Sequence, residues 1–324
     1  MTIWTASALV VVGLILLAGG GDLLVRGATS IARMAGLTPA VIGLTVVALG
    51  TSLPELVVSV IASIDRQPDL AVGNAVGSNL FNITVILGLA ALIARLPIRG
   101  SVVKLEWPVM FLASAVCVGF SRDGVIDRIE AGVFLVSLVA FMAYSVYLAR
   151  REVSAAEQAD LVAEVQSLTL RRPGRDLALA IGATVGGVAI LVVGGKLLVD
   201  GAVRLAQVAG LSERVIGLTI VAAGTSAPEV ATSVVAAVKR QSDIAVANLI
   251  GSNIFNILGI LGTAGLILPL RVAPGMLNHD MVWMVGTALL LFVLMWFRKT
   301  LSRPDGLILL GAYAVYLVGL LKDA

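Results

Sequence analysis

The sequence predicts an all-α integral membrane protein with about ten transmembrane helices in two inverted five-helix repeats, and three observations carry this prediction. Hydrophobic residues make up 59% of the chain and charged residues only 13%, and the mean hydropathy is +1.02. Soluble domains average about 25% charged residues. The apolar residues gather in segments close to the ~20 residues that a helix needs to cross the hydrocarbon. Finally, one long stretch of the sequence occurs twice.

The apolar segments form two groups of five on either side of one polar linker. We expect spans at 3–33, 40–64, 69–94, 105–120 and 126–149, and then at 177–205, 214–238, 243–268, 280–297 and 305–321. This divides the chain into a first repeat (1–149), a linker (150–176) and a second repeat (177–324). Because five is an odd number, the second repeat must enter the membrane inverted relative to the first.

The distribution of positive charge predicts the orientation. With the N-terminus outside, the inner connectors hold fourteen Lys and Arg residues and the outer connectors hold seven. Cytoplasmic loops carry the excess of positive charge, so both termini are predicted outside and the linker 150–176 in the cytoplasm. The first apolar segment has no basic region before it and no small-residue cleavage site, so we interpret it as a span of a plasma (inner) membrane protein and not as a signal peptide.

The repeated stretch covers residues 41–88 and returns at 215–262, shifted by 174 positions, with 30 of 48 residues identical and no gap. Each copy holds Gly-Thr-Ser-x-Pro-Glu in one apolar segment and Gly-Ser-Asn-x-Phe-Asn in the next. Ionisable residues are costly in hydrocarbon and usually mark an ion or substrate path. One intramembrane Glu could simply hold helices together, but two in the same context indicate a cation site. Two ionised carboxylates would need such a cation to compensate them.

The first motif combines a helix break with oxygen ligands. Pro54 and Pro228 lack an N–H, so they are predicted to free the carbonyls of Gly50 and Gly224. Carboxylates and hydroxyls beside each break are hard ligands that suit calcium, magnesium or sodium. These residues are Thr51, Ser52 and Glu55 in the first copy and Thr225, Ser226 and Glu229 in the second.

The second motif adds Ser78 and Asn82, which lie four residues apart and therefore on one helical face. Ser252 and Asn256 repeat this pair in the second copy. The motif thus predicts a second helix whose hydroxyl and amide oxygens complete the site.

Other polar residues near the motifs are predicted to be structural. Asn79 and Asn253 lie off the face of the second motif, so we interpret them as amides that pack helices. Asp69 and Asp243 open the same helices and are predicted to be N-caps.

Polar residues outside the motifs have simpler interpretations. Asp22 with Arg26, and Lys196 with Asp200, stand four residues apart, as in helical ion pairs. The only histidine, His279, is predicted to be solvated in a connector.

Several classes of function are excluded by what the sequence lacks. No Gly-rich phosphate loop with its Lys is present, and no Ser/His/Asp or Cys/His set exists, since the chain has one Cys and one His. We therefore expect a transporter and not an enzyme, with no cofactor and no direct use of ATP. The basic residues are scattered at segment ends, so no nucleic-acid partner is expected.

The motifs Gly50–Glu55 and Gly224–Glu229, with the two Gly-Ser-Asn-x-Phe-Asn words, resemble those of the cation/calcium exchanger superfamily, in its prokaryotic sodium/calcium exchanger branch. The resemblance implies secondary active antiport of calcium against sodium by alternating access. It implies an ion site formed by Thr51, Ser52, Glu55, Ser78, Asn82 and the carbonyl of Ala48, with Thr225, Ser226, Glu229, Ser252, Asn256 and the carbonyl of Ala222.

One position departs from the family pattern. Relatives with well-understood sodium coupling carry an acid at one of the two positions held here by Asn82 and Asn256. The site charge is therefore at most −2, so a third sodium ion would be uncompensated. Sodium coupling remains the better interpretation, because the proton-coupled branch has Gly-Asn-x-x-Glu in place of the first motif. A proton- or potassium-linked antiporter, a passive cation channel and a membrane protein that no longer transports remain alternatives.

Overall fold

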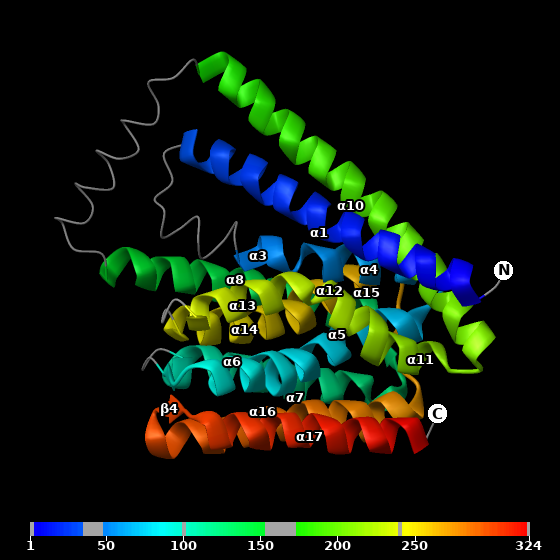
Figure 1. Ribbon diagram of the computed structural model, residues 1–324, viewed down its shortest axis with the longest axis vertical. Helices are drawn as coiled ribbons and strands as arrows, with labels where there is room; N and C mark the ends of the chain where they lie inside the picture. The colour runs from blue at the N-terminus through cyan, green and yellow to red at the C-terminus, as the bar shows by residue number, and fades with distance from the viewer. Residues whose placement is uncertain (1–2, 35–47, 99–101, 153–172, 239–241, 323–324) are drawn as a thin grey trace.

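The computed structural model describes residues 3–34, 48–98, 102–152, 173–238 and 242–322. The described chain is almost entirely helical, as Figure 1 shows. Two long helices, α1 (Ile3–Met34) and α10 (Pro173–Ala209), lie side by side and obliquely across one face of the remaining helices.

The first half continues from α1 through further helices, several of which adjoin a π-helical or 3-10 turn. In order these are α3 (Ala48–Thr51), α4 (Leu53–Ile64), α5 (Pro68–Phe81), η2 (Asn82–Ile86), α6 (Leu87–Ile93), η3 (Val102–Glu106), α7 (Trp107–Phe120), η4 (Ser121–Asp123) and α8 (Arg128–Glu152).

The second half follows the same plan after α10. Its elements are α11 (Glu213–Ile216), η5 (Gly217–Val221), α12 (Ala222–Thr225), α13 (Ala227–Val238), α14 (Ser242–Phe255), η6 (Asn256–Leu261), α15 (Gly262–Ile267), η7 (Met276–Asp280), α16 (Met281–Arg298) and α17 (Arg303–Lys322). Apart from the 3-10 turn η4, the η elements are π-helical turns.

A helical membrane bundle is confirmed. Within the described residues, eight helices are long and apolar enough to cross a membrane, or nine if the bent pair 213–225 and 227–234 counts as one span. The predicted span 40–64 is described only from Ala48 onward, and the rest lies outside the described residues. Residues 153–172 of the predicted linker also lie outside them, while α8 and α10 extend into its two ends.

The outer surface of the bundle is apolar. Trp4, Ile129 and Val136 are 81%, 78% and 71% exposed, respectively. Large hydrophobic side chains exposed on several helices are unfavourable in water. Lipid contact accounts for them, because hydrocarbon tails solvate such side chains as well as a protein core does.

Glycines allow α1 and α10 to touch backbone to backbone. They recur every seven residues, at Gly13, Gly20 and Gly27 on α1 and at Gly187, Gly194 and Gly201 on α10. A Cβ added to Gly20 would lie 3.1 Å from the Gly187 carbonyl oxygen, and one added to Gly187 would lie 2.6 Å from the Leu24 nitrogen. Small residues at such spacing let membrane helices approach closely. The pair is therefore a closely packed unit.

Charged residues on α1 and α10 form the predicted helical ion pairs. Arg26 Nε lies 2.9 Å from Asp22, and Lys196 Nζ lies 3.0 Å from Asp200. Lys196 also reaches Asp65, just after α4, at 2.7 Å. This third contact, between residues far apart in sequence, ties α10 to the end of α4.

Two short strand pairings join the halves of the chain. β1 (Leu96–Pro97) pairs antiparallel with β4 (Thr300–Leu301), and β2 (Val125–Ile126) pairs antiparallel with β3 (Leu270–Arg271). In both cases a connector of the first half pairs with a connector of the second. The halves are therefore interlocked and do not lie as separate units.

The helices of the second motif differ from the prediction in the residue at which α5 begins, and they contain π-helical turns that were not predicted. α5 begins at Pro68 after Gln67, so the prediction that Asp69 is its N-cap was wrong: Asp69 is the second residue of the helix. The side chain of Asp243 lies outside the described residues. π-helical turns begin at Asn82 and at Asn256. Such turns widen a helix and are common at functional sites.

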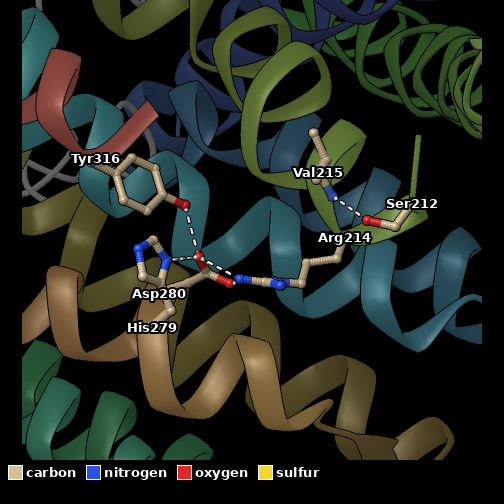
Figure 2. Close-up of polar contacts among 6 residues, drawn as sticks. All are labelled: Ser212, Arg214, Val215, His279, Asp280 and Tyr316. Carbon is tan, nitrogen blue, oxygen red and sulfur yellow. Dashed lines mark hydrogen bonds and ion pairs between the residues drawn. The ribbon is translucent and has the colours of Figure 1, made fainter. Parts of the chain in front are cut away.

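The start of α11 is fixed by a cap and a buried ion pair (Figure 2). The Ser212 hydroxyl accepts a hydrogen bond from the Val215 N–H. Arg214 Nε lies 2.6 Å from one Asp280 oxygen, and a second guanidinium nitrogen lies 3.1 Å from the other. Asp280 is fully buried and the Arg214 side chain is only 12% exposed. The bidentate pair therefore anchors the first half of the bent span to η7.

The prediction that His279 is solvated in a connector was wrong. His279 lies in η7, where its ring stacks on Tyr316 with centroids 5.6 Å apart. Its Nδ1 lies 3.0 Å from Asp280, and the Tyr316 hydroxyl donates to the same carboxylate at 3.2 Å (Figure 2). The carboxylate thus has three partners from three elements.

Replacing Asp280 with Asn is expected to destabilise the protein by about 3–5 kcal/mol, because it removes the fully buried carboxylate charge that the Arg214 guanidinium contacts at two atoms. The measurement is the free energy or temperature of unfolding in detergent. Lys196→Ala is the matched control, since its ion pairs are half exposed and should contribute no more than about 1 kcal/mol. Equal losses from the two variants would contradict a special role for the buried pair.

Candidate ion-binding site

Two buried glutamates lie just beyond breaks in equivalent helices. The backbone leaves the helical region at Ser52 and Ser226, where ψ is 8° and 9°, and the predicted breaks are thereby confirmed. Helices α4 and α13 then begin, each with a Pro followed by Glu55 or Glu229 in its first turn. Both glutamates are 1% exposed. A helix N-terminus favours a negative charge, so each break also supports its carboxylate.

Each glutamate is hydrogen-bonded by a serine of the other half. The Ser226 hydroxyl donates to Glu55 Oε1 at 2.9 Å, and the Ser52 hydroxyl donates to Glu229 Oε1 at 3.1 Å. Both serines are fully buried. The two copies of the first motif therefore meet and form one crossed site.

The second motif joins the same site through its serines. Ser78 Oγ lies 3.1 Å from Ser226 Oγ, and Ser252 Oγ lies 3.5 Å from Glu229 Oε1. The structure thus brings four predicted hydroxyl ligands, two from each half, beside the two carboxylates.

Oxygens of two predicted ligands in the second copy of the first motif take part in hydrogen bonds within the helix. The Thr225 hydroxyl lies 3.1 Å from the Val221 carbonyl and 3.3 Å from the Ala222 carbonyl. The Ser226 N–H donates to the Ala222 carbonyl at 3.1 Å. In the first copy, Ala48 begins α3 and Thr51, which is partly buried, ends it.

Asn74 is a member of this region that sequence reasoning missed. Its amide nitrogen donates to the Glu55 carbonyl at 3.1 Å and to the Ser59 hydroxyl at 3.0 Å, while its oxygen lies 3.1 Å from the Thr225 hydroxyl. Asn74 is fully buried. The signal was its identity with Asn248 in the second copy, but no neighbouring motif marked it.

The two copies differ in these hydrogen bonds. Asn248 and Ser233 stand 174 positions after Asn74 and Ser59. Among the described residues, however, the Asn248 amide nitrogen and the Ser233 hydroxyl are buried and have no partner. The pseudo-equivalent halves are therefore in different local conformations.

Asn82 and Asn256 bond across the two halves. The Asn82 amide nitrogen donates to Asn253 Oδ1, and the Asn256 amide nitrogen donates to Asn79 Oδ1, both at 2.9 Å. All four side chains are at most 1% exposed. The interpretation of Asn79 and Asn253 as amides that merely pack helices was therefore incomplete, because they bond to two predicted ligands.

Four oxygen atoms of the site are buried and have no hydrogen-bond partner in the described structure. They are Oε2 of Glu55, Oε2 of Glu229, Oδ1 of Asn82 and Oδ1 of Asn256. Buried polar atoms are nearly always satisfied, so each exception calls for an explanation. Two carboxylate and two amide oxygens are acceptors that fit a hard cation such as calcium or sodium. No group of three His, Cys, Asp or Glu that could hold a metal ion occurs in the described parts of the chain. Hydroxyl, amide and backbone carbonyl oxygens are further ligands that suit such a cation.

Comparisons with known proteins show the family to which the chain is similar. A family model described as "Sodium/calcium exchanger protein" matches residues 5–147 and 179–322. "Inner membrane protein YrbG" of Escherichia coli (strain K12) is 39% identical over 316 residues, which cover 96% of this chain and 95% of the relative. "Sodium/calcium exchanger MaX1" of Methanosarcina acetivorans is 31% identical over 338 residues, which cover 96% and 97% of the two chains.

A solved structure is similar over nearly the whole length. The sodium-calcium exchanger NCX_Mj, soaked with sodium and strontium, superposes with a TM-score of 0.67 and 30% identity, covering 98% of this chain and 99% of its own. The motifs, the crossed site, the family match and the structural similarity lead to one conclusion: the chain belongs to the sodium/calcium exchanger protein family.

Proposed function

We propose that the protein exchanges calcium for sodium across the plasma (inner) membrane by alternating access. The observation that carries this proposal is the set of four buried, unpartnered oxygens contributed equally by two equivalent halves. The carboxylates of Glu55 and Glu229 supply a charge of −2, which one calcium ion or two sodium ions would balance. Ser52, Ser226, Ser78 and the remaining hydroxyls and carbonyls then complete the coordination shells. The names of MaX1 and NCX_Mj support these two ions as substrates.

Alternating access is supported by the unequal hydrogen bonding of the two copies. Asn74 bonds to Ser59 and the Glu55 carbonyl, whereas Asn248 and Ser233 lack partners. In an inverted repeat, exchange of these conformations between the halves would open the site to the opposite side of the membrane. The α1–α10 pair lies outside the core that carries the motifs and would shift against it.

The proposed orientation places both termini outside and the linker 150–176 in the cytoplasm. Lys322 is an exposed, charged residue at the C-terminal end of α17, and Cys117 is buried. Lys322→Cys in a Cys117→Ala background is therefore expected to react with a membrane-impermeant maleimide added to intact cells. Reaction only after the membrane is permeabilised would place the C-terminus inside.

Radiolabelled calcium uptake tests the exchange. Proteoliposomes are loaded in turn with sodium, with potassium or with acidic buffer that creates a proton gradient, and are diluted into calcium. We expect uptake driven by internal sodium. Uptake driven only by potassium or only by protons would identify that ion, and not sodium, as the coupling ion. Uptake that needs no counter-ion gradient would indicate a channel instead.

The site charge predicts the stoichiometry. With Asn at both 82 and 256, the fixed charge of −2 favours two sodium ions per calcium, so exchange should be nearly electroneutral. Calcium uptake in sodium-loaded vesicles should then change little when a membrane potential is imposed. A reversal potential that fits three sodium ions per calcium would overturn this stoichiometry.

A further inference from the structure

Four asparagines form a hydrogen-bonded network between the two halves, and their hydrogen bonds fix which way each amide faces. The Asn79 amide nitrogen lies 3.3 Å from the Asn253 carbonyl and 3.7 Å from the Met284 sulfur. The Asn253 amide nitrogen lies 3.4 Å from the Asn79 carbonyl and 3.6 Å from the Met110 sulfur. Backbone carbonyls and thioether sulfurs only accept hydrogen bonds. The nitrogens of Asn79 and Asn253 must therefore face them.

The orientation of the other two amides follows. With their nitrogens committed, Asn79 and Asn253 present their oxygens to Asn256 and Asn82, and these oxygens need donors. Asn256 and Asn82 supply them from their amide nitrogens at 2.9 Å. The Oδ1 atoms of Asn82 and Asn256 are thereby left over, and they are the buried oxygens without partners.

We propose that Asn79 and Asn253 are positioning residues, which hold the oxygens of Asn256 and Asn82 toward the transported ion. This inference rests on the proposed function, because it gives those oxygens an ion to face. An amide that could turn over would present an N–H group to a cation, which is repulsive. The hydrogen bonds from Asn256 and Asn82 to Asn79 and Asn253 prevent that turn.

The same network requires a hydrogen-bond donor at positions 82 and 256, which a carboxamide supplies and an ionised carboxylate does not. A carboxylate at 256 would set an acceptor oxygen against the Asn79 oxygen, where the present structure has a donor at 2.9 Å. The relation between Asn82 and Asn253 imposes the same restriction on position 82. Asn79 and Asn253 therefore also help keep the site charge at the −2 supplied by the glutamates.

A double-mutant cycle with purified protein in detergent tests the positioning role. The readout is the calcium concentration that gives half of the maximal rise in melting temperature, since a ligand that binds only the folded state stabilises it. Asn79→Ala is expected to raise this calcium concentration about tenfold, because the hydrogen bond that orients the Asn256 amide is lost. In an Asn256→Ala background, the same change should have no further effect, because the amide that Asn79 orients is gone.

The symmetry of the asparagine network supplies the matched control. Asn79 bonds to Asn256 and not to Asn82, so Asn79→Ala should retain its full effect in an Asn82→Ala background. Asn253→Ala should show the reverse pattern, with its effect lost in Asn82→Ala and kept in Asn256→Ala. Ser114→Ala, which removes only a bond to a carbonyl of its own helix, should leave the calcium midpoint unchanged.

The melting temperature without calcium separates folding defects from ion binding, and the Asn253 cycle serves if Asn79 variants do not fold. Effects of Asn79→Ala that add equally to both backgrounds would overturn the positioning role while leaving the proposed function intact. A wild-type protein that neither calcium nor sodium stabilises would overturn the proposed function, and with it this inference.

Discussion

Glu55→Gln and Glu229→Gln are each expected to abolish calcium transport while the protein still folds. Either change halves the charge of the site, so bound calcium would keep one uncompensated positive charge in a region where both glutamates are 1% exposed. Leaving such a charge unpaired costs about 3–5 kcal/mol, which corresponds to a loss of roughly a thousandfold in affinity. Gln keeps the volume of Glu and an oxygen that can accept from Ser226 or Ser52, so the crossed serine contacts should survive.

Sodium-driven calcium uptake in proteoliposomes measures this effect, and the melting temperature in detergent checks folding. Asp176→Asn is the control, because Asp176 is an exposed acid at the start of α10 and should leave uptake unchanged. Substantial uptake by either glutamine variant would show that the ion does not bind between these carboxylates.

Gly20→Leu is expected to separate α1 from α10, and both the melting temperature and calcium uptake should fall sharply. A Cβ at this position would lie 2.9 Å from the Leu191 backbone nitrogen, and backbone atoms cannot move aside without moving the helix. Overpacking at such a contact typically costs about 1–3 kcal/mol or more. The loss of uptake follows because the two long helices would no longer move as one unit.

The neighbouring residue provides the control. Gly19 is exposed, and a Cβ added to it would meet no atom within 4 Å. Gly19→Leu should therefore fold and transport like the unchanged protein. Equal losses of stability in Gly19→Leu and Gly20→Leu would show that glycine is needed at these positions for helix flexibility and not for the backbone contact.

The sequence was sufficient for features that repeat at fixed spacing in an apolar setting. Helical spans, the breaks at Ser52 and Ser226 and the i,i+4 ion pairs were predicted because each depends on local chemistry. The paired motifs also identified Glu55, Glu229, Asn82 and Asn256, each of which has a buried oxygen without a hydrogen-bond partner in the described structure.

Features that depend on contacts between distant parts of the chain could not be predicted in this way. The crossing of Ser226 to Glu55 depends on how the halves pack, and so does the bonding of Asn79 to Asn256. The π-helical turns and the two-residue strands are too short to leave a periodic pattern. His279 was misplaced because its burial is set by Tyr316, which lies on another helix.

The crossed contacts have a consequence for how such a chain could arise. Neither half holds a complete set of partners. Ser226 of the second half donates to Glu55 of the first, and Ser52 of the first half donates to Glu229 of the second. The strands β1 and β2 likewise pair with strands of the opposite half. A single half could satisfy these groups only by pairing with a second copy of itself. Duplication of a gene and later fusion of the two copies would yield this arrangement. The two halves, produced as separate polypeptides in one cell, should therefore assemble with each other.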